Sequence, residues 1–252
     1  MSKVILPNKE IDIIGNIFIM SDIHACFRTF KKALDIINFK DTDFLIIDGD
    51  AIDRGGKNNV DLINFIKDSK NILLLRGNHE EFLLRTLSNE LSISNWDSFG
   101  GKNTITEMNN LSNIDYLNFT KFIKNTPLYC KVIIENKEYF ISHNGLNVDL
   151  PLIKNNGTIN IEETIKSQYS LDWFNFFISS DIHYIPSTYK FDYYWITGHT
   201  PTIKITNEAK IIKRKIFMDI DCGCSYNNGM LGVINLCTFE EYYVNIVKKD
   251  FL

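Results

Sequence analysis

Four of the five histidines in this chain lie in short polar clusters that follow apolar runs. The other polar residues in these clusters are mainly carboxylates and an amide. Imidazole and oxygen donors without thiolates suit Mn, Fe, Zn or related divalent cations rather than a structural cysteine-type zinc site. The candidate side chains are numerous enough for two cations: Asp22, His24, Asp50, Asp53, Asn78, His79, His143 and His199.

The densest cluster is Gly-Asp-Ala-Ile-Asp-Arg-Gly at residues 49–55, directly after the apolar run 44–47. This run is short and closed by a glycine, which predicts a buried strand. Two carboxylates and an arginine at a strand end are costly to desolvate unless they are paired or bind metal. From this stretch alone, a loop with a structural Asp–Arg pair remains an open alternative.

The elements that position these clusters repeat regularly. Asp22, Asp50 and Asn78 are each 28 residues apart (50 − 22 and 78 − 50). Apolar runs at 17–20 and 72–75 flank the run at 44–47, and apolar residues at helical spacing lie between them. Strand–helix–strand–helix–strand with short connections predicts a parallel sheet with right-handed crossovers. Three polar clusters should therefore meet at one sheet edge, where ligands bind in open α/β sheets.

The remaining chain predicts a single α/β domain, residues 1–252, with central mixed β-sheets flanked by helices. Helical patterns cover about 96–126, with a break at Gly100-Gly101, and a short helix near 171–178 lies in an otherwise irregular, aromatic-rich segment. The expected strands are a hairpin (132–134 with 139–141), 194–196, and three antiparallel strands at 216–218, 231–234 and 242–244, with 219–224 as a further core strand.

Composition narrows the class of protein. The 252 residues are 44% hydrophobic and 23% charged, which are globular values. The net charge of −4 provides no basic footprint for nucleic acid. Five cysteines without a paired framework favour free thiols in a reducing compartment. The apolar stretch at 11–20 is too short and polar to span a membrane, so we expect a cytoplasmic protein. No sequence feature decides the oligomeric state, and a monomer is the default expectation.

Five motifs together resemble the metallophosphoesterase superfamily. Within it, the chain is most similar to the phosphoprotein phosphatase family in its compact bacterial and phage form. The resemblance covers about residues 16–236 and implies a calcineurin-like architecture. The motifs, in order, are Asp-x-His at 22–24, Gly-Asp-x-x-Asp-Arg-Gly at 49–55, Gly-Asn-His-Glu at 77–80, Ser-His at 142–143 and Gly-His-Thr-Pro at 198–201.

The resemblance implies a dinuclear centre, with manganese as the expected metal and Fe, Zn, Ni or Co as alternatives. Two cations about 3.5–4 Å apart lower the pKa of a shared water and orient it for in-line attack on phosphorus. Asp50 would bridge the two metals, since a carboxylate has two oxygens. The implied terminal ligands are Asp22 and His24 on the first metal, and Asn78, His143 and His199 on the second.

The resemblance also implies catalytic and substrate-binding roles. His79 would protonate the leaving alkoxide, and Asp53 would orient that imidazole and raise its pKa. Arg54 and Arg76 would clamp phosphate oxygens, and Asn78 would also lie beside the substrate. The alternative for His79 is a buried histidine with a purely structural role.

One departure concerns phosphate binding. Related enzymes usually place an arginine shortly after a tryptophan between the last two histidine motifs. Here Trp173 has no such arginine after it, and none occurs between residues 86 and 213. Asn175 or Lys166 could substitute more weakly, so we expect reduced phosphate affinity. A second Asp-x-His at 181–183 has no strand before it, and we interpret His183 as a surface or lid residue.

These observations favour a serine/threonine protein phosphatase acting on phosphorylated proteins or small phosphorylated substrates. A dinucleoside-polyphosphate hydrolase, such as one cleaving diadenosine tetraphosphate, is the alternative enzyme. A non-catalytic scaffold of the same fold is the alternative from another class. Asp53 and Glu80 favour the protein phosphatase branch by resemblance.

Overall fold

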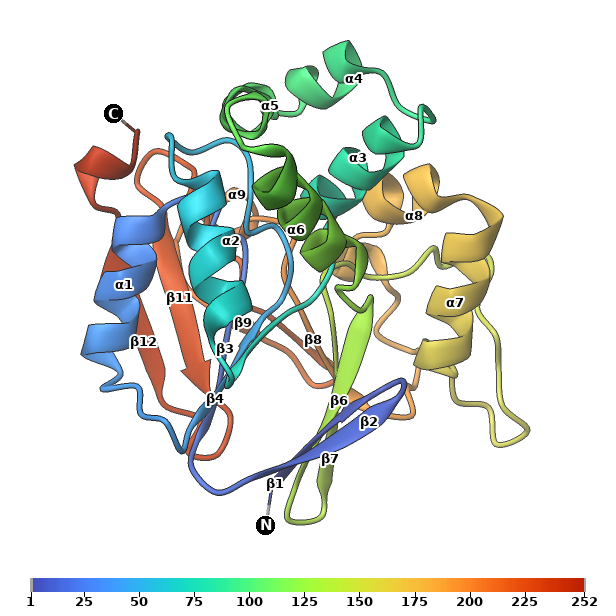
Figure 1. Ribbon diagram of the computed structural model, residues 1–252. Helices are drawn as coiled ribbons and strands as arrows, with labels where there is room; N and C mark the ends of the chain where they lie inside the picture. The colour runs from blue at the N-terminus through green and yellow to red at the C-terminus, as the bar shows by residue number, and fades with distance from the viewer. Residues whose placement is uncertain (1, 252) are drawn as a thin grey trace.

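The computed structural model describes residues 2–251, which form two stacked β-sheets between two layers of helices (Figure 1). One sheet has seven strands in the order β2-β1-β6-β7-β8-β10-β9, and the other has five in the order β12-β11-β3-β4-β5. Helices α1 and α2 lie on one side, and α7 and α8 lie on the other. Both sheets contain parallel and antiparallel pairs, which confirms the predicted mixed α/β architecture.

The strands are short, as is usual for globular sheets. The five-stranded sheet contains β3 (Ile17–Met20), β4 (Phe44–Ile47), β5 (Ile72–Leu74), β11 (Met230–Asn235) and β12 (Glu241–Asn245). The seven-stranded sheet contains β1 (Ser2–Leu6), β2 (Lys9–Ile13), β6 (Tyr129–Ile134), β7 (Lys137–Ser142), β8 (Tyr194–Thr197), β9 (Ile212–Lys213) and β10 (Phe217–Asp219).

The helices connect these strands or cover the sheets. They are α1 (Phe27–Ile36), α2 (Asn59–Asp68), α3 (Asn78–Leu87), α4 (Ile93–Ser98), α5 (Lys102–Asn109), α6 (Asn113–Lys124), α7 (Ile161–Leu171), α8 (Trp173–Ser179) and α9 (Thr202–Thr206), with 3-10 turns η1 (Ile182–Tyr184) and η2 (Lys248–Phe251).

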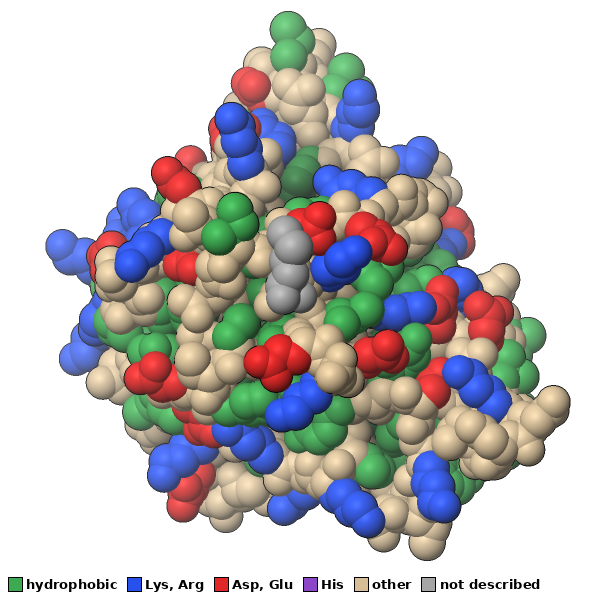
Figure 2. All heavy atoms as spheres, turned by 90° about the horizontal axis from the view of Figure 1, so that it is seen from below, with side chains coloured by type: hydrophobic (Ala, Val, Ile, Leu, Met, Phe, Trp, Pro, Cys, Tyr) green, Lys and Arg blue, Asp and Glu red, His purple; other side chains and the backbone are tan. Residues whose placement is uncertain are grey.

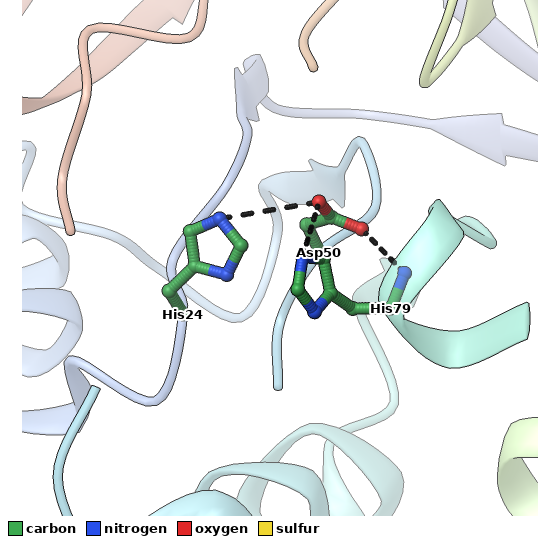
Figure 3. A group of neighbouring side chains, drawn as sticks. All are labelled: His24, Asp50 and His79. Carbon is green, nitrogen blue, oxygen red and sulfur yellow. Dashed lines mark hydrogen bonds and ion pairs between the residues drawn. The ribbon is translucent and has the colours of Figure 1, made fainter. Parts of the chain in front are cut away.

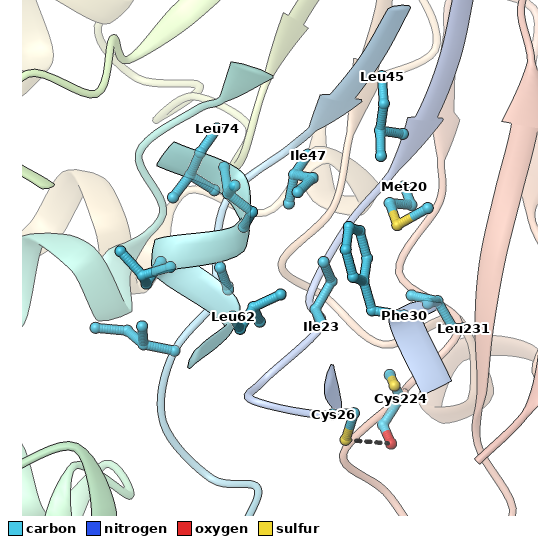
Figure 4. Packing of buried hydrophobic residues seen from close by; sticks show 14 of the residues in the cluster. Met20, Ile23, Cys26, Phe30, Leu45, Ile47, Leu62, Leu74, Cys224 and Leu231 are labelled. Carbon is cyan, nitrogen blue, oxygen red and sulfur yellow. Dashed lines mark hydrogen bonds between the residues drawn. The ribbon is translucent and has the colours of Figure 1, made fainter. Parts of the chain in front are cut away.

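The central strands are apolar throughout because both of their faces are buried. In β3, Ile17 and Ile19 pack between the two sheets, whereas Phe18 and Met20 face the helical layer. Successive side chains of a strand point to opposite faces, so an uninterrupted apolar run can fill two cores. Figure 4 shows the helical side, where Phe30 of α1 packs over Met20 and Ile23.

The predicted parallel unit is present. Strand β3 pairs in parallel with β4, and β4 pairs in parallel with β5, so their carboxyl ends lie along one edge. Strands β7 and β8 are likewise parallel, and both lead into histidine motifs. This arrangement brings segments from residue 22 to residue 199 to one end of the sandwich.

Three details differ from the sequence predictions. The strand at 216–218 was expected to be antiparallel, but β10 runs parallel to β8, and its antiparallel partner is the short β9. Strand β10 ends at Asp219, so 220–224 is a buried loop rather than a core strand. The segment expected to be irregular contains α7, because Ile161 and Ile165 share one buried face that packs with Phe140 and Trp195.

The surface is mixed in charge. On the face seen in Figure 2, basic and acidic side chains lie close together among hydrophobic and polar ones, in agreement with the small net charge. Within residues 2–251, no helix has both the length and the apolar character needed to cross a membrane.

Candidate active site

Five strand ends deliver the predicted site residues to one buried cluster. β3 leads to Asp22 and His24, β4 to Asp50 and Asp53, and β5 to Asn78 and His79, while β7 and β8 lead to His143 and His199. Most of these side chains have almost no exposed surface. Residues separated by up to 177 positions in the chain thus become neighbours, as in the 3.0 Å hydrogen bond from the His199 N–H to Asp22 Oδ2.

Asp50 lies at the centre of two groups that could each hold a metal ion. The donor atoms of Asp50, His24 and His79 lie within 4.8 Å of one another, and so do those of Asp50, His143 and His199. Figure 3 shows His24 and His79 on either side of the Asp50 carboxylate. The shared carboxylate agrees with the expectation that Asp50 bridges two cations.

Asp22 and Asn78 complete the surroundings of these groups. His24 Nε2 lies 3.7 Å from Asp22 Oδ1. Asn78 Oδ1 lies 3.1 Å from His143 Nε2 and 2.9 Å from His199 Nδ1. The six side chains predicted as metal ligands are therefore all in one place.

The backbone at this edge is unusual. Six predicted site residues have positive φ angles: Asp22 (53°), His24 (48°), Asp50 (51°), Asp53 (71°), Arg54 (59°) and His199 (74°). The left-handed region costs most residues of order 1 kcal/mol or more, and such conformations concentrate at functional sites. These turns direct several polar side chains inward over a short length of chain.

Glu80 ties the start of α3 to the Asp50 loop. Its buried carboxylate accepts hydrogen bonds from the N–H groups of Gly77, Asp50 and Ala51, each at 2.9 Å. Gly77 is required by the close approach, because a Cβ there would lie 2.2 Å from Asp50 Oδ1. Burial, with Asp50 as the next cause, raises the pKa of Glu80 to about 7.

Backbone carbonyls orient two of the imidazoles. His24 Nδ1 lies 3.1 Å from the Ile52 carbonyl, and His143 Nδ1 lies 2.8 Å from the Asp48 carbonyl. Each Nδ1–H can therefore donate outward, which leaves the Nε2 lone pair facing the cluster. This is the usual arrangement of histidines that bind metals.

The donor set fits divalent cations on two counts. Among the described residues, the buried Asp22 Oδ1 has no hydrogen-bond partner. Burial, followed by the charge of His143, lowers the pKa of His199 to about 3, and burial followed by Arg54 lowers that of His24. Both rings are then neutral, which is the form that coordinates a metal.

The cluster also carries negative charge. Burial opposes ionisation of Asp50, but the imidazoles of His143 and His79 together outweigh it and hold its pKa well below the usual range. An ionised carboxylate in a buried site requires compensating positive charge. Burial lowers the pKa of His143, but the charges of Asp50 and Asp22 outweigh it and raise that pKa well above its usual range, so the His143 imidazole provides such charge, and a divalent cation beside Asp50 would also provide it when bound.

His79 and Asp53 form a second functional unit. His79 Nδ1 lies 2.7 Å from Asp53 Oδ2, and neither side chain has any exposed surface. Asp53 also accepts from Trp96 Nε1 at 2.7 Å and from the Thr104 hydroxyl. With three donors, the carboxylate is fixed in position, and it in turn fixes the imidazole.

Trp96 is a site residue that the sequence analysis did not single out. Gly101, noted only as part of a helix break, lies directly against it, and a Cβ at that position would be 2.5 Å from Trp96 Nε1. Thr104 follows the same glycine pair in the sequence. The order Trp, Gly-Gly and Thr over residues 96–104 is a sequence signal that could have identified Trp96 and Thr104 as partners of Asp53.

Arg54 lies at the margin of the cluster. Its Nη1 is 3.1 Å from His24 Nε2, and its backbone N–H donates to the Gly100 carbonyl at 3.0 Å. Arg54 is exposed and also has a positive φ, 59°. It is therefore fixed at the backbone and open to solvent at the guanidinium, as a phosphate-binding arginine should be.

Arg76 is placed differently from what was expected. Its guanidinium donates to Glu81 Oε2 at 3.2 Å, to Thr126 Oγ1 at 3.3 Å and to the carbonyls of Lys124 and Thr126 at 2.8 Å. All three guanidinium nitrogens already have protein acceptors. Binding phosphate would require Arg76 to give up these contacts, so we propose that its role is structural.

Lys166, one of the two suggested substitutes for the missing arginine, has other partners, and His183 lies elsewhere than expected. Lys166 pairs with Glu162 at 2.7 Å and Glu163 at 3.0 Å. His183, expected at the surface or on a lid, is mostly buried and lies 2.7 Å from Asp219 Oδ2. The closest contact between a guanidinium and the cluster is that of Arg54 with His24.

The protein comparisons agree with this geometry. The family model described as calcineurin-like phosphoesterase matches residues 15–203. The symmetrical bis(5'-nucleosyl)-tetraphosphatase of Haemophilus ducreyi is 42% identical over 72 residues, 28% of this chain and 26% of that protein. Serine/threonine-protein phosphatase 2 of Salmonella typhimurium is 30% identical over 135 residues, 52% of this chain and 59% of that protein.

Among solved structures, a protein described as a candidate diadenosine tetraphosphatase superposes with a TM-score of 0.58 and 16% identity, covering 96% of this chain and 97% of its own. This likeness concerns the fold alone. The chain matches between about a quarter and three fifths of the two curated relatives' lengths. The family match, which extends over most of the chain, shows that this protein belongs to the calcineurin-like phosphoesterase family.

Proposed function

We propose that this chain is a metal-dependent serine/threonine protein phosphatase in which His79 protonates the leaving oxygen. The pairing of His79 with Asp53 is the observation that supports this function best. His79 Nδ1 is held at 2.7 Å by a buried carboxylate, while Nε2 has no partner among the described residues and lies 3.7 Å from Asp50 Oδ2. A proton held on Nε2 would lie beside the proposed metal ligands.

The leaving group explains why this dyad favours phosphomonoesters. A serine or threonine alkoxide is a strong base and departs readily only if it receives a proton as the P–O bond breaks. Proton transfer from a positioned acid contributes about 10²–10⁴-fold. A nucleoside diphosphate leaves as a stable anion and gains less from a proton.

The other residues would have supporting roles. Asp22, His24, Asp50, Asn78, His143 and His199 would hold two divalent cations, with manganese as the proposed metal. Such cations supply a water of lowered pKa and positive charge beside the phosphate. Arg54 would bind phosphate oxygens, and Asp53 would stabilise the charge on His79 before proton transfer.

A dinucleoside-polyphosphate hydrolase is the second candidate. The Haemophilus relative supports this candidate, because it is named a symmetrical bis(5'-nucleosyl)-tetraphosphatase and is 42% identical over 72 residues, 28% of this chain. The absence of a second-half arginine in the sequence is compatible with either substrate. The two candidates differ in the leaving group, and that difference can be measured.

The decisive experiment compares a phosphothreonine peptide with diadenosine tetraphosphate in manganese, with a chelator as control. We expect faster turnover of the peptide, and faster cleavage of the dinucleotide would replace our proposal with the second candidate. If neither substrate shows metal-dependent turnover, the scaffold hypothesis becomes the better one.

A further inference from the structure

One cavity borders α3 on the face that carries Glu81, Leu84 and Arg85, on the side opposite His79. It has a volume of about 670 Å³ and lies between α3, α6 and Tyr169 of α7. His79 and Glu81 are two residues apart, so they project about 200° apart around the helix axis. The cavity is therefore about one helix diameter, about 10–12 Å, from the metal-binding cluster. Figure 1 shows α6 beside α3, with α7 and α8 nearby. We call this space the α3–α6 cavity.

A buried carboxylate organises the floor of the α3–α6 cavity. Glu81, with 1% of its side chain exposed, accepts from Arg85 Nε at 2.6 Å, Arg76 Nη1 at 3.2 Å and the Tyr169 hydroxyl at 2.9 Å. The Arg85 guanidinium also lies 4.9 Å from the ring centre of Trp173. Both arginines are thus held rigidly, and Arg85 also pairs with Glu90 at 2.6 Å.

Two lysines on the wall from α6 remain without acidic partners. Lys121 and Lys124 line the cavity. Within residues 2–251, the basic partners in the ion pairs at this cavity are Arg76 and Arg85 and neither lysine. Both lysines are exposed. Counting all lining residues, four basic side chains face two acidic ones, so the cavity favours an anionic ligand.

The spacing of the lysines fits an extended peptide. Residues three apart on a helix have Cβ atoms about 5–6 Å apart. Alternate residues of an extended chain point to the same side about 6.5–7 Å apart. Two acidic residues separated by one position could therefore pair with Lys121 and Lys124. Leu84, Leu87 and Leu117 provide an apolar surface beside them.

The aromatic residues argue against a nucleotide base. Arg85 stacks against Trp173, and the hydroxyl of Tyr169 is occupied by Glu81. Phe176 and Phe177 pack against the Tyr169 ring. Stacking platforms for bases require an open aromatic face, and Arg85, Phe176 and Phe177 cover the ring of Tyr169, which lines the cavity.

We propose that the α3–α6 cavity binds an acidic segment of the phosphoprotein substrate, in which acidic and aliphatic residues alternate. This inference rests on the proposed phosphatase function and extends it to substrate selection. Charge pairing on an exposed helix favours encounter and specificity more than raw affinity. The site therefore selects among phosphoproteins that would otherwise compete equally for the catalytic cluster.

The test measures binding rather than turnover. Fluorescence anisotropy would follow a labelled, unphosphorylated peptide of alternating Glu and Val, compared with its Gln/Val counterpart. We expect the Glu peptide to bind more tightly, and K121Q/K124Q to weaken it by about 5- to 20-fold, from two exposed pairs. The matched control K32Q/K70Q, which removes two exposed lysines elsewhere, should leave the affinity unchanged.

Three results would overturn the inference: equal binding of both peptides, no effect of K121Q/K124Q in a variant that melts like the wild type, or displacement of the Glu peptide by ATP through a shared site. Phosphate release from a phosphothreonine peptide is measured separately. A chain that binds the Glu peptide through these lysines but releases no phosphate would refute the phosphatase proposal and leave the acidic-peptide site standing.

Discussion

The two sheets contribute differently to the candidate active site. The five-stranded sheet supplies Asp22, His24, Asp50, Asn78 and His79 from three parallel strands, together with Asp53 and Arg54. The seven-stranded sheet supplies His143 and His199 from β7 and β8. The first sheet thus carries the proposed proton donor and phosphate-binding group, whereas the second supplies only proposed metal ligands. Mutations of the site residues of the second sheet should therefore affect metal retention alone, whereas those of the first sheet can affect either metal retention or chemistry.

Replacing His79 should have the largest effect. We expect H79N to reduce kcat for a phosphothreonine peptide by about 10²–10⁴-fold, because the leaving alkoxide loses its acid. H199N, in the other sheet, should instead lower the affinity for manganese, measured by isothermal titration calorimetry. With p-nitrophenyl phosphate, whose leaving group needs no proton, H79N should lose much less activity. Equal losses on both substrates would show that His79 acts as a metal ligand or a structural residue.

The two arginines that follow strands of the first sheet should behave in opposite ways. R76A should lower the free energy of unfolding by about 2–3 kcal/mol, because it leaves the buried Glu81 short of a partner. R54A should be nearly neutral for stability and should raise KM. Urea denaturation would measure the free energy of unfolding of both variants, and steady-state kinetics would measure their KM. If R76A raised KM while keeping its stability, Arg76 would be a phosphate ligand after all.

Replacing Trp96 tests whether the His79–Asp53 pair depends on the side chains that hold Asp53 in place. W96F keeps the aromatic packing but removes one of the three donors to Asp53, so we expect a loss of about 1–2 kcal/mol in stability. The kcat should fall while the affinity for manganese is unchanged, since no proposed metal ligand is touched. A parallel fall in manganese affinity would mean that Asp53 supports the metal cluster and not the acid.

The smallest effect is expected in the helical cover of the second sheet. Burial opposes ionisation of Glu162, but hydrogen bonds from Lys131, Lys166 and Tyr129 outweigh it and lower its pKa to about 2. Because the folded pKa lies below the ordinary value of 4.5, this stabilisation is present above pH 4.5 and is lost as pH falls toward 2.

E162Q should therefore cost about 1 kcal/mol at neutral pH, a modest value because 23% of the Glu162 side chain is exposed and water screens the pair. The difference from the wild type should shrink as pH falls below 4.5, as measured by urea unfolding across that range. A difference that is independent of pH would assign the loss to packing. The kcat at neutral pH serves as the control and should not change.

The sequence by itself determined the first sheet and its polar edge. Short apolar runs, helical spacing between them and polar clusters at intervals of 28 residues were sufficient to predict β3, β4 and β5 and the convergence of Asp22, Asp50 and Asn78. These features are local, so periodicity and motif order reveal them. The motif order also predicted the phosphoesterase family, which the family match confirmed.

Only the tertiary structure decided which groups are free to act. Arg54 and Arg76 look equivalent in sequence, yet Thr126, 50 residues away, and Glu81 occupy the guanidinium of Arg76. Trp96 and Thr104 became partners of Asp53 through contacts spanning 43 and 51 residues. The parallel placement of β10 likewise depends on β8 rather than on its own residues. A side chain's availability depends on which distant donors and acceptors fold against it, and no local pattern records that competition.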